Sequence, residues 1–391
     1  MKEELVFERS EEWFLQRKAG ITVKEILQQP RLWETLADNL EARKEEIVQF
    51  MQQVLSVKDL RIVFAGAGSS AFIGESMQKL LMRDLKIKSE AVHTTEIVCS
   101  PDITLYDVPT LLVSYARSGD SPESVASLRY ARKKIKNLYN LVIVCNQHSS
   151  LADYAAEESG TLVLNMPQEA CDKGFAMTSS VSCMALATFC AFNYSNLCNC
   201  TQLVRKLAQS IKQNMPRFDK AARLIAAKDY NRVVYLGSGA MYGLAREGAV
   251  KSLELTNGYV NATFDTPTGF RHGPKTVLTQ QTLSVHFLSP NKFNLRYDTD
   301  VAKELISEKH NIVAVLVEKG ASQDIADADF VLEYDIPENA ISKELVAYIN
   351  GLIFSQMLSV EKSLEREITT DNPCPKGEVN RVVKGVVIYE L

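Results

Sequence analysis

The feature that most constrains the fold is a strand, a glycine turn and a helix that follow one another twice along the chain. In the first copy, the β-rich run 61–65 leads into Gly66-Ala67-Gly68-Ser69-Ser70 and then into helical periodicity over 71–85. In the second copy, roughly 170 residues later, the run 232–236 leads into Gly237-Ser238-Gly239 and another helix. A strand that feeds a helix through a tight turn is typical of parallel α/β sheets, so the recurrence predicts an internal duplication.

Further strands alternate with helical segments in both halves of the chain. Because these strands are apolar along nearly their whole length, they fit sheets that are covered by helices on both faces. The sequence therefore predicts an α/β fold with two tandem parallel sheets flanked by helices. The additional strands are expected at 110–114, 141–145 and 161–165, with a helix at 122–134 between the first two, and then at 282–288, 312–317 and 330–332.

Four parts are expected along the chain, with the boundary between the two sheets near residues 195–205. Helical patterns dominate the start, and Asp371-Asn372-Pro373-Cys374-Pro375 breaks regular structure near the end. The expected parts are an N-terminal helical segment at 1–58 with helices at 13–18, 23–29 and 32–55, a first α/β domain at 59–200, a second at 201–365 that opens with a helix at 201–227, and a C-terminal tail at 366–391.

The composition argues against two classes of binding partner, nucleic acid and membranes. The 391 residues are 46% hydrophobic and 24% charged, with a net charge of −4, which is typical of a soluble globular protein. A mildly acidic chain is a poor general binder of nucleic acid or of an anionic membrane. No run approaches the roughly 18 apolar residues of a membrane span, and no signal peptide is evident at Met1-Lys2-Glu3-Glu4. We expect a cytoplasmic protein without a nucleic-acid or membrane partner.

The cysteines and histidines give only a weak indication of a metal site. None of the eight cysteines forms a paired CxxC spacing, so buried free thiols in a reducing compartment are the default interpretation. Cys198-Asn199-Cys200 could contribute metal ligands, but few histidines lie near it in the sequence. We therefore expect neither a metal nor a cofactor.

Serine and threonine side chains cluster where helices follow strands, which is typical of phosphate sites. Glycines let a ligand approach the backbone, and helix N-terminal N–H groups and hydroxyls donate to an anion. Any tight strand–helix turn looks similar, and a helix start needs only one capping hydroxyl, so these alternatives stay open. The candidate phosphate-binding residues are Ser69 and Ser70 at the first turn, Ser118 and Ser121 at the second, and Thr178 and Ser179 at a third.

The helix after the second glycine turn carries two carboxylates and one ammonium on one face. Glu247, Lys251 and Glu254 are spaced i, i+4 and i+7, which places them within about 60° of one another on an α-helix. Such a group can hold one carboxylate ready to move protons. The alternative is a solvated face with ordinary i,i+4 pairing. The position of the helix directly after a glycine turn favours the catalytic interpretation.

One histidine stands apart from the other four. His272 lies in Gly269-Phe270-Arg271-His272-Gly273-Pro274, and segments of this kind run on the surface or line sites. A neutral imidazole can shuttle protons near pH 7. The alternative is a loop histidine that bonds backbone. The remaining histidines show no partner pattern and are interpreted as structural.

Together these motifs resemble the double-SIS (sugar isomerase) proteins, which include the isomerase half of glucosamine-6-phosphate synthase. The resemblance covers nearly the whole chain after residue 50, and its details are most similar to the AgaS subgroup, called galactosamine-6-phosphate deaminase/isomerase or tagatose-6-phosphate ketose/aldose isomerase. It rests on Gly66-Ala67-Gly68-Ser69-Ser70, Ala116-Arg117-Ser118-Gly119-Asp120-Ser121, Ala176-Met177-Thr178-Ser179-Ser180, Glu247 to Glu254, His272-Gly273-Pro274 and the tail around Lys384.

The resemblance implies a role for each matching residue. Ser70, Ser118 and Ser121 would hold the phosphate of a sugar phosphate. Glu254 would move a proton between C1 and C2, and His272 would assist ring opening. The implied setting is completed by Glu247 and Lys251, which would orient the site, and by Lys384, which would reach the substrate from the tail.

Two departures from the family pattern bear on these roles. Ala116 stands where the family has the first serine of the second phosphate loop, so one hydroxyl contact is missing. The spacing from Glu254 to His272 is slightly longer than in the synthase. In the family this histidine can reach the site from the neighbouring subunit, which implies a homodimer or a higher homo-oligomer.

The implied reaction is the conversion of galactosamine 6-phosphate to tagatose 6-phosphate and ammonia. The synthase makes its ammonia with a glutaminase domain that has an N-terminal cysteine, whereas residue 2 here is Lys and the N-terminal helical segment is too short for such a domain. This difference favours ammonia release. Two alternatives stay open: a plain ketose/aldose isomerase, and a non-catalytic sugar-phosphate sensor. The preference for a galacto or a gluco sugar is not determined by the sequence.

Overall fold

The structure is a computed structural model that describes residues 8–377, 379–381, 383 and 385–391. Its contacts divide the chain into two compact units, each built around one β-sheet. The first-sheet unit comprises residues 29–172, 177–205 and the described part of 379–391. The second-sheet unit comprises residues 173–176 and the described parts of 1–28 and 206–378.

Both sheets are parallel and have five strands in the same order. The first runs β2-β1-β3-β4-β5, and the second, read from the β7 edge, runs β7-β6-β8-β9-β10. The two parallel α/β domains expected from the sequence are therefore confirmed. The strands are β1 Arg61–Gly66, β2 Glu90–His93, β3 Thr110–Ala116, β4 Leu138–Val144, β5 Thr161–Asn165, β6 Arg232–Gly237, β7 Asn261–Asp265, β8 Thr282–Phe287, β9 Ile312–Glu318 and β10 Phe330–Tyr334.

The duplication extends to individual side chains. Phe64 on β1 stacks on Tyr115 on β3, with ring centroids 6.2 Å apart and an interplanar angle of 17°. At the corresponding strands of the second sheet, Tyr235 on β6 stacks on Phe287 on β8 at 5.8 Å and 17°. Each pair lies at the centre of its sheet and is buried, so each sheet has the same aromatic core.

The two glycine turns also match in conformation. A Cβ on Gly66 would lie 2.6 Å from the carbonyl carbon of Ser70, and a Cβ on Gly237 would lie 2.3 Å from the carbonyl oxygen of Met241. Two residues later, Gly68 and Gly239 have positive φ angles of 55° and 59°. Only glycine accommodates both requirements without strain, so the sequence pattern reports a real backbone constraint.

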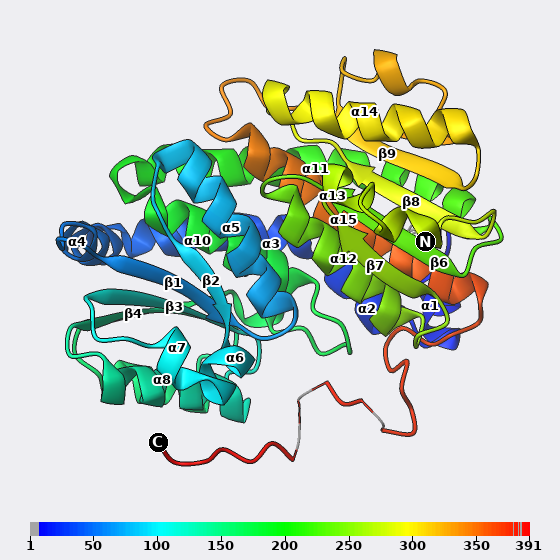
Figure 1. Cartoon of the computed structure of the whole chain (residues 1–391). Helices are drawn as coiled ribbons and strands as arrows, with labels where there is room; N and C mark the ends of the chain where they lie inside the picture. The colour runs from blue at the N-terminus through cyan, green and yellow to red at the C-terminus, as the bar shows by residue number, and fades with distance from the viewer. Residues whose placement is uncertain (1–7, 378, 382, 384) are drawn as a thin grey trace, which may run out of the picture. The chain divides into compact units, whose positions relative to one another are not determined.

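Helices cover both faces of the first sheet (Figure 1). On the face that carries Phe64, the apolar helix α10 packs against β4. The ring centroid of Phe192, at the end of α10, lies 5.5 Å from that of Phe64. On the opposite face, α8 and α9 pack on alternate strand residues such as Leu112, Val142 and Val144. The helices of this unit are α3 Gln29–Ala42, α4 Lys44–Leu55, α5 Ser69–Leu85, α6 Thr94–Cys99, α7 Pro101–Thr104, α8 Pro122–Lys134, α9 Ser150–Ala156 and α10 Ser179–Phe192.

The second sheet has an equivalent arrangement. Helices α12 and α15 pack on each other over the face that carries Tyr235, while α13 and α14 cover the other face, where Val234 and Val315 contribute to the core. The carboxylate of Asp371, in the tail, accepts hydrogen bonds from the backbone N–H groups of Ile21 and Thr22 and so caps α2. The helices here are α1 Glu11–Gln16, α2 Gly20–Leu27, α12 Met241–Leu255, α13 Pro267–Phe270, α14 Lys292–Glu308 and α15 Lys343–Glu365, together with most of α11 Leu197–Ala226.

The structure differs from the sequence-based expectation in three elements. The helix expected over 32–55 is two helices that meet at Arg43, whose backbone leaves the helical region. The guanidinium of Arg43 donates to the carbonyl oxygen of Val163 at 2.7 Å. The strands β2 and β7 were not predicted. Strand β2 borders β1 and strand β7 borders β6, each at an edge of its sheet. The residues of these two strands are only partly buried, so they lack the apolar run that marks the central strands.

No single helix in the described part of the chain is both long and apolar enough to cross a membrane. Helices α10 and α11, joined across a bend, meet the length and composition requirements only as a pair.

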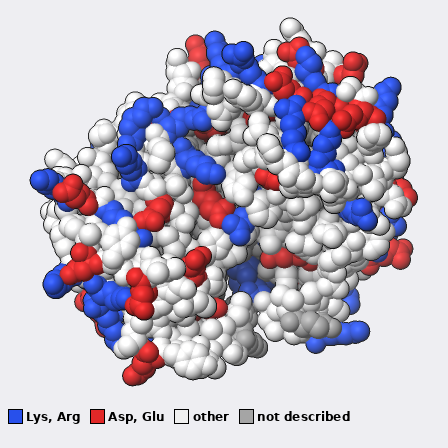
Figure 2. Space-filling view, in the orientation of Figure 1, with Lys and Arg blue, Asp and Glu red and all other residues white. Residues whose placement is uncertain are grey.

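Figure 2 shows acidic and basic side chains intermixed over the visible face. Around α14 the mixing takes the form of ion pairs, such as Arg271 with Glu304 at 2.6 Å and Lys275 with Glu308 at 2.6 Å. Pairs this exposed contribute little to stability, so they serve mainly to keep the surface charge mixed.

The core of the second sheet makes a prediction about acid stability. Burial lowers the pKa of His286 on β8 to about 4, so the folded chain keeps this imidazole neutral. As the pH falls below about 6.5, the unfolded chain binds the proton first, and stability is lost until the pH nears 4. The loss should reach about 3 kcal/mol at 1.36 kcal/mol per pKa unit. His286→Gln removes this loss, which chemical denaturation at a series of pH values would measure.

The matched control is His310→Gln, because His310 is exposed. If wild type and His286→Gln lose stability in parallel as the pH falls, the buried imidazole does not contribute as argued.

Candidate active site

The carboxyl end of the first sheet brings two of the serine-rich turns together. Strands β1 and β3 are neighbours, with Ala65 paired to Ser114, and the helices that follow them, α5 and α8, cover opposite faces. The turns therefore diverge at the point where the strand order reverses, which is where open α/β sheets bind ligands. Ser69 and Ser70 come from one turn, and Ser118 and Ser121 from the other.

Several of these hydroxyls are not used to cap their helices. Ser121 precedes α8, yet its side chain makes no capping bond and instead lies 2.9 Å from the hydroxyl of Ser124. The hydroxyl of Ser70 contacts the sulfur of Met177 at 3.9 Å, which is a weak interaction. Ser118 accepts a long bond of 3.4 Å from the N–H of Asp120. Weakly engaged hydroxyls at a helix N-terminus suit an incoming anion.

The third turn is organised differently. The buried carboxylate of Asp172 accepts hydrogen bonds from the N–H groups of Thr178, Ser179 and Ser180 at 2.8, 3.0 and 2.9 Å, and from the hydroxyl of Thr178 at 3.0 Å. An internal carboxylate therefore already occupies the anion position at the start of α10. Sequence analysis groups Thr178 and Ser179 with the phosphate loops, but in the structure they donate these hydrogen bonds to Asp172.

Asp172 also links the second phosphate turn to the tail. Its carbonyl oxygen accepts a bond from Nε of Arg381 at 3.0 Å, and the carbonyl oxygen of Arg381 accepts one from the buried guanidinium of Arg117 at 2.8 Å. Sequence reasoning missed both residues: Arg381 lies far along the chain from the turns, and Asp172, although only six residues before Thr178, belongs to no motif that marks it as an acceptor. Lys384, also expected in the site, lies outside the described residues.

The one cation of the charged group on helix α12, Lys251, is buried. The side chain of Lys251 is fully buried and that of Glu247 is 1% exposed, whereas that of Glu254 is 32% exposed. The ammonium of Lys251 lies 3.6 Å from Oε1 of Glu247 and donates a close hydrogen bond to Oε2 of Glu254. A solvated helix face is therefore not the arrangement found here.

The approach of α12 to its sheet explains the burial. Gly248 faces Tyr235, and a Cβ on this glycine would lie 2.9 Å from the tyrosine ring. The hydroxyl of Tyr235 lies 3.0 Å from that of Ser252, which lies 3.2 Å from that of Ser359 on α15. The helix is thus held close to β6 and α15, and its buried lysine must be paired with carboxylates.

His272 lies on an exposed turn between α13 and the short helical segment Pro274–Val277. The hydroxyl of Thr266 caps α13 by accepting the N–H of Gly269 at 3.1 Å, which fixes the start of this segment. No hydrogen bond from the described residues holds the imidazole, so it is free to meet a ligand. No group of three or more potential ligand side chains in the described residues could hold a metal ion.

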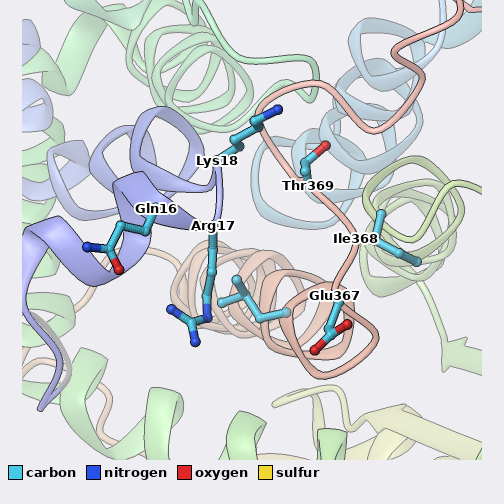
Figure 3. A pocket seen from close by; sticks show the side chains of 7 residues that line it. Gln16, Arg17, Lys18, Glu367, Ile368 and Thr369 are labelled. Carbon is cyan, nitrogen blue, oxygen red and sulfur yellow. The ribbon is translucent and has the colours of Figure 1, made fainter.

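A cavity of about 340 Å³ lies elsewhere in the second-sheet unit, between the ends of α1 and α15 (Figure 3). Figure 3 shows Arg17 and Glu367 pointing to the same side of it. None of its lining residues is a predicted site residue, and it lies at helix ends rather than at the carboxyl edge of a sheet. Its lining residues are Gln16, Arg17, Lys18, Leu364, Glu367, Ile368 and Thr369.

Comparison with known proteins gives consistent matches. A family profile for the SIS domain matches residues 55–193. The chain is 39% identical over 373 residues to a Streptomyces coelicolor protein provisionally named D-galactosamine-6-phosphate deaminase AgaS, with 95% of each chain covered. It is 34% identical over 396 residues to the D-galactosamine-6-phosphate deaminase AgaS of a Shewanella species, with 97% of this chain and 94% of that protein covered.

A solved structure matches over nearly the full length. The crystal structure of a Clostridium novyi protein, provisionally named a tagatose-6-phosphate ketose/aldose isomerase, gives a TM-score of 0.94 at 36% identity. The match covers 99% of this chain and 100% of that chain.

The Asp172 cluster makes a prediction about stability. Asp172→Asn replaces a charged acceptor of several buried donors with a neutral amide, and bonds to charged groups are worth about 1.5–3 kcal/mol each. We expect the free energy of unfolding to fall by at least about 2 kcal/mol, as measured by urea denaturation.

Asp120→Asn is the matched control. Asp120 accepts the N–H and the hydroxyl of Ser150 at the start of α9, but it is exposed. We expect a loss below about 1 kcal/mol there. Equal losses in the two variants would show that burial does not strengthen the Asp172 interactions.

Proposed function

We propose a function from one premise: the chain belongs to the AgaS family of double-SIS proteins. It is an enzyme of the amino-sugar-phosphate deaminase and isomerase class. The reaction that we propose converts galactosamine 6-phosphate and water to tagatose 6-phosphate and ammonia. The observation that carries this proposal is the partly exposed carboxylate of Glu254, which a fully buried ammonium holds on α12.

The phosphate group would bind at the carboxyl end of the first sheet. The N-terminus of α5 and the hydroxyls of Ser70, Ser118 and Ser121 supply dipole and donors of the kind that bind a phosphate. Ser69 opens α5 and is 5% exposed, as Ser70 is, so it would contribute beside Ser70 at the same helix N-terminus. Thr178 and Ser179 would support this site indirectly, because their backbone N–H groups already donate to the carboxylate of Asp172.

The proton transfer would be carried by Glu254. Its carboxylate removes the proton from C2 of the open-chain aldose, and the electron pair of the C–H bond forms a C1=C2 double bond as the aldehyde oxygen takes up a proton. The carboxylate then returns the proton to C1 while the nitrogen loses one, which leaves an imine at C2. Water hydrolyses the imine to the ketone and ammonia.

The neighbouring charges would set the conditions for that transfer. Lys251 holds Glu254 in place and supplies positive charge near the oxygen that develops negative charge, and Glu247 balances the buried ammonium. His272, exposed on its turn, would move the ring-oxygen proton as the hemiacetal opens. Lys384 would stabilise the same developing charge from the tail.

The central test is Glu254→Gln, which keeps the shape of the side chain but removes its ability to accept a proton. We expect kcat for ammonia release from galactosamine 6-phosphate to fall by about 10² to 10⁴, with binding of the substrate retained. A coupled ammonia assay and calorimetric titration of the variant would measure the two quantities.

Glu365→Gln is a closely matched control. Glu365 is also 32% exposed and pairs with the nearly buried Lys362 at the same i,i+3 spacing, near the end of α15. Normal turnover in the Glu254 variant would remove Glu254 as the base, and an equal fall in the Glu365 variant would show a general effect of lost ion pairs.

The phosphate loops make a second prediction. Ser118→Ala and Ser70→Ala each remove one donor to a charged group, so KM should rise by about 10-fold or more while kcat stays near its original value. Ser127→Ala is the control, because its buried hydroxyl bonds the carbonyl of Ser124 on the same helix. An unchanged KM in both loop variants would place the phosphate elsewhere.

A plain ketose/aldose isomerase is the second candidate, and the name of the Clostridium novyi structure supports it. The same carboxylate would then move the proton between C1 and C2 of an unaminated sugar phosphate. Ammonia release from galactosamine 6-phosphate favours the deaminase, whereas isomerisation of tagatose 6-phosphate without ammonia release from the amino sugar favours the isomerase.

We also propose a cytoplasmic homodimer or higher homo-oligomer. Buried thiols such as Cys145, Cys183 and Cys200 suit a reducing compartment. His272 is exposed and has no hydrogen-bond partner among the described residues, which suits a site completed by a second subunit. Light scattering of the purified protein would determine its mass in solution.

A further inference from the structure

The cavity of about 340 Å³ between the ends of α1 and α15 carries charged groups that the proposed function does not use. Its lining includes two cations, Arg17 and Lys18, one carboxylate, Glu367, and the half-buried apolar side chains of Leu364 and Ile368. All of these residues belong to the second-sheet unit. A cavity of this volume suits a small molecule.

Arg17 is held in one orientation and still has donors to offer. Its guanidinium stacks on the ring of Trp13, 3.9 Å from the ring centroid, and Nη1 donates a long hydrogen bond of 3.4 Å to the carbonyl oxygen of Trp13. Stacking uses the face of the guanidinium and leaves the N–H groups at its edge available. Arg17 is therefore suited to bind a carboxylate through two parallel hydrogen bonds.

Glu367 supplies the opposite charge at the other side of the cavity. It follows the C-cap of α15, where its φ of 56° places it in the left-handed region, and its side chain is exposed, as that of Arg17 is. Figure 3 shows its carboxylate and the guanidinium of Arg17 pointing to the same side of the cavity. Neither group has an ion-pair partner among the residues that the structure describes. Two opposite charges therefore face the same space without neutralising each other.

Hydrogen bonds fix the backbone on both sides of the cavity. On the α1 side, the carbonyl oxygen of Lys18 accepts the N–H of Asp371 at 3.0 Å. On the α15 side, the N–H of Ile368 donates to the carbonyl oxygen of Ser363 at 2.9 Å, and the hydroxyl of Ser363 donates to the carbonyl oxygen of Ile368 at 3.0 Å. Walls that are already ordered lose less conformational entropy when a ligand binds.

We propose that this cavity binds a zwitterion, namely an α-amino acid with an apolar side chain. The carboxylate of the ligand pairs with Arg17, and its ammonium pairs with Glu367, where the carboxyl end of α15 adds partial negative charge. Its side chain packs on Leu364 and Ile368. A ligand with a single charge satisfies only one side of the cavity. The site is additional to the proposed function and does not depend on it.

The probe is L-leucine, titrated calorimetrically into the full chain. Isocaproate has the same skeleton without the amine, isoamylamine has it without the carboxylate, and glycine lacks the apolar side chain. We expect L-leucine to bind at one site per chain, at least about 10-fold more tightly than each of the others, which is about 1.4 kcal/mol. Equal or tighter binding of isocaproate or isoamylamine, or no binding of L-leucine, would overturn the proposal. Equal binding of glycine would overturn the role of the apolar wall.

Arg17→Gln and Glu367→Gln locate the site. Each variant removes one charge, so each should weaken the binding of L-leucine by about 10-fold. The losses should also be specific to the charge removed. In Arg17→Gln, L-leucine should lose its advantage over isoamylamine, because the carboxylate no longer has a partner. In Glu367→Gln, L-leucine should lose its advantage over isocaproate, because the ammonium no longer has one.

Arg296→Gln and Glu338→Gln are the matched controls, because both side chains are exposed in the second-sheet unit and neither lines the cavity. We expect both variants to bind L-leucine as wild type does. Equal losses in the controls, or unchanged binding in both cavity variants, would show that the ligand does not bind here and that the proposal is wrong. Binding of L-leucine without ammonia release from galactosamine 6-phosphate would contradict the proposed function alone, so the two failures are distinguishable.

Discussion

The arrangement of the second domain depends on one buried ion pair network. The ammonium of Lys251 has no exposure to solvent, so the carboxylates of Glu247 and Glu254 must face it from the same helix. That requirement fixes the rotation of α12, and Gly248 allows the helix to lie against Tyr235. One carboxylate is buried with the lysine while the other remains partly exposed. The same constraint therefore leaves the carboxylate of Glu254 partly open to solvent.

Duplication produced two sheets of one topology with different electrostatics. At the first reversal of strand order, the hydroxyl of Ser70 contacts a sulfur and the hydroxyl of Ser118 accepts a long hydrogen bond. At the second reversal, Asp298 is buried and the side chain of Asn291 accepts N–H groups at the start of α14. Sheets with the same strand order can thus differ in chemistry, because a few side chains decide which donors are already taken.

The sequence predicted the central strands and the glycine turns well, because these depend on local rules. Gly66 and Gly68 satisfy a close approach and a positive φ that no other residue meets as easily. The edge strands β2 and β7 were missed because half-buried strands carry no distinctive apolar pattern. The break at Arg43 was missed because the amphipathic pattern continues through it without a glycine or proline to mark a helix end.

The sequence by itself determined the fold class, the repeat and the group Glu247, Lys251 and Glu254, since periodicity and spacing are written in the chain. Only the tertiary structure decided how buried each charge is and which donors are already taken. Thr178 resembles Ser118 in sequence, yet the N–H and the hydroxyl of Thr178 both donate to Asp172, whereas the hydroxyl of Ser118 accepts a long bond from the N–H of Asp120. The physical reason is that hydrogen-bond satisfaction and desolvation depend on neighbours in space, which spacing along the chain does not reveal.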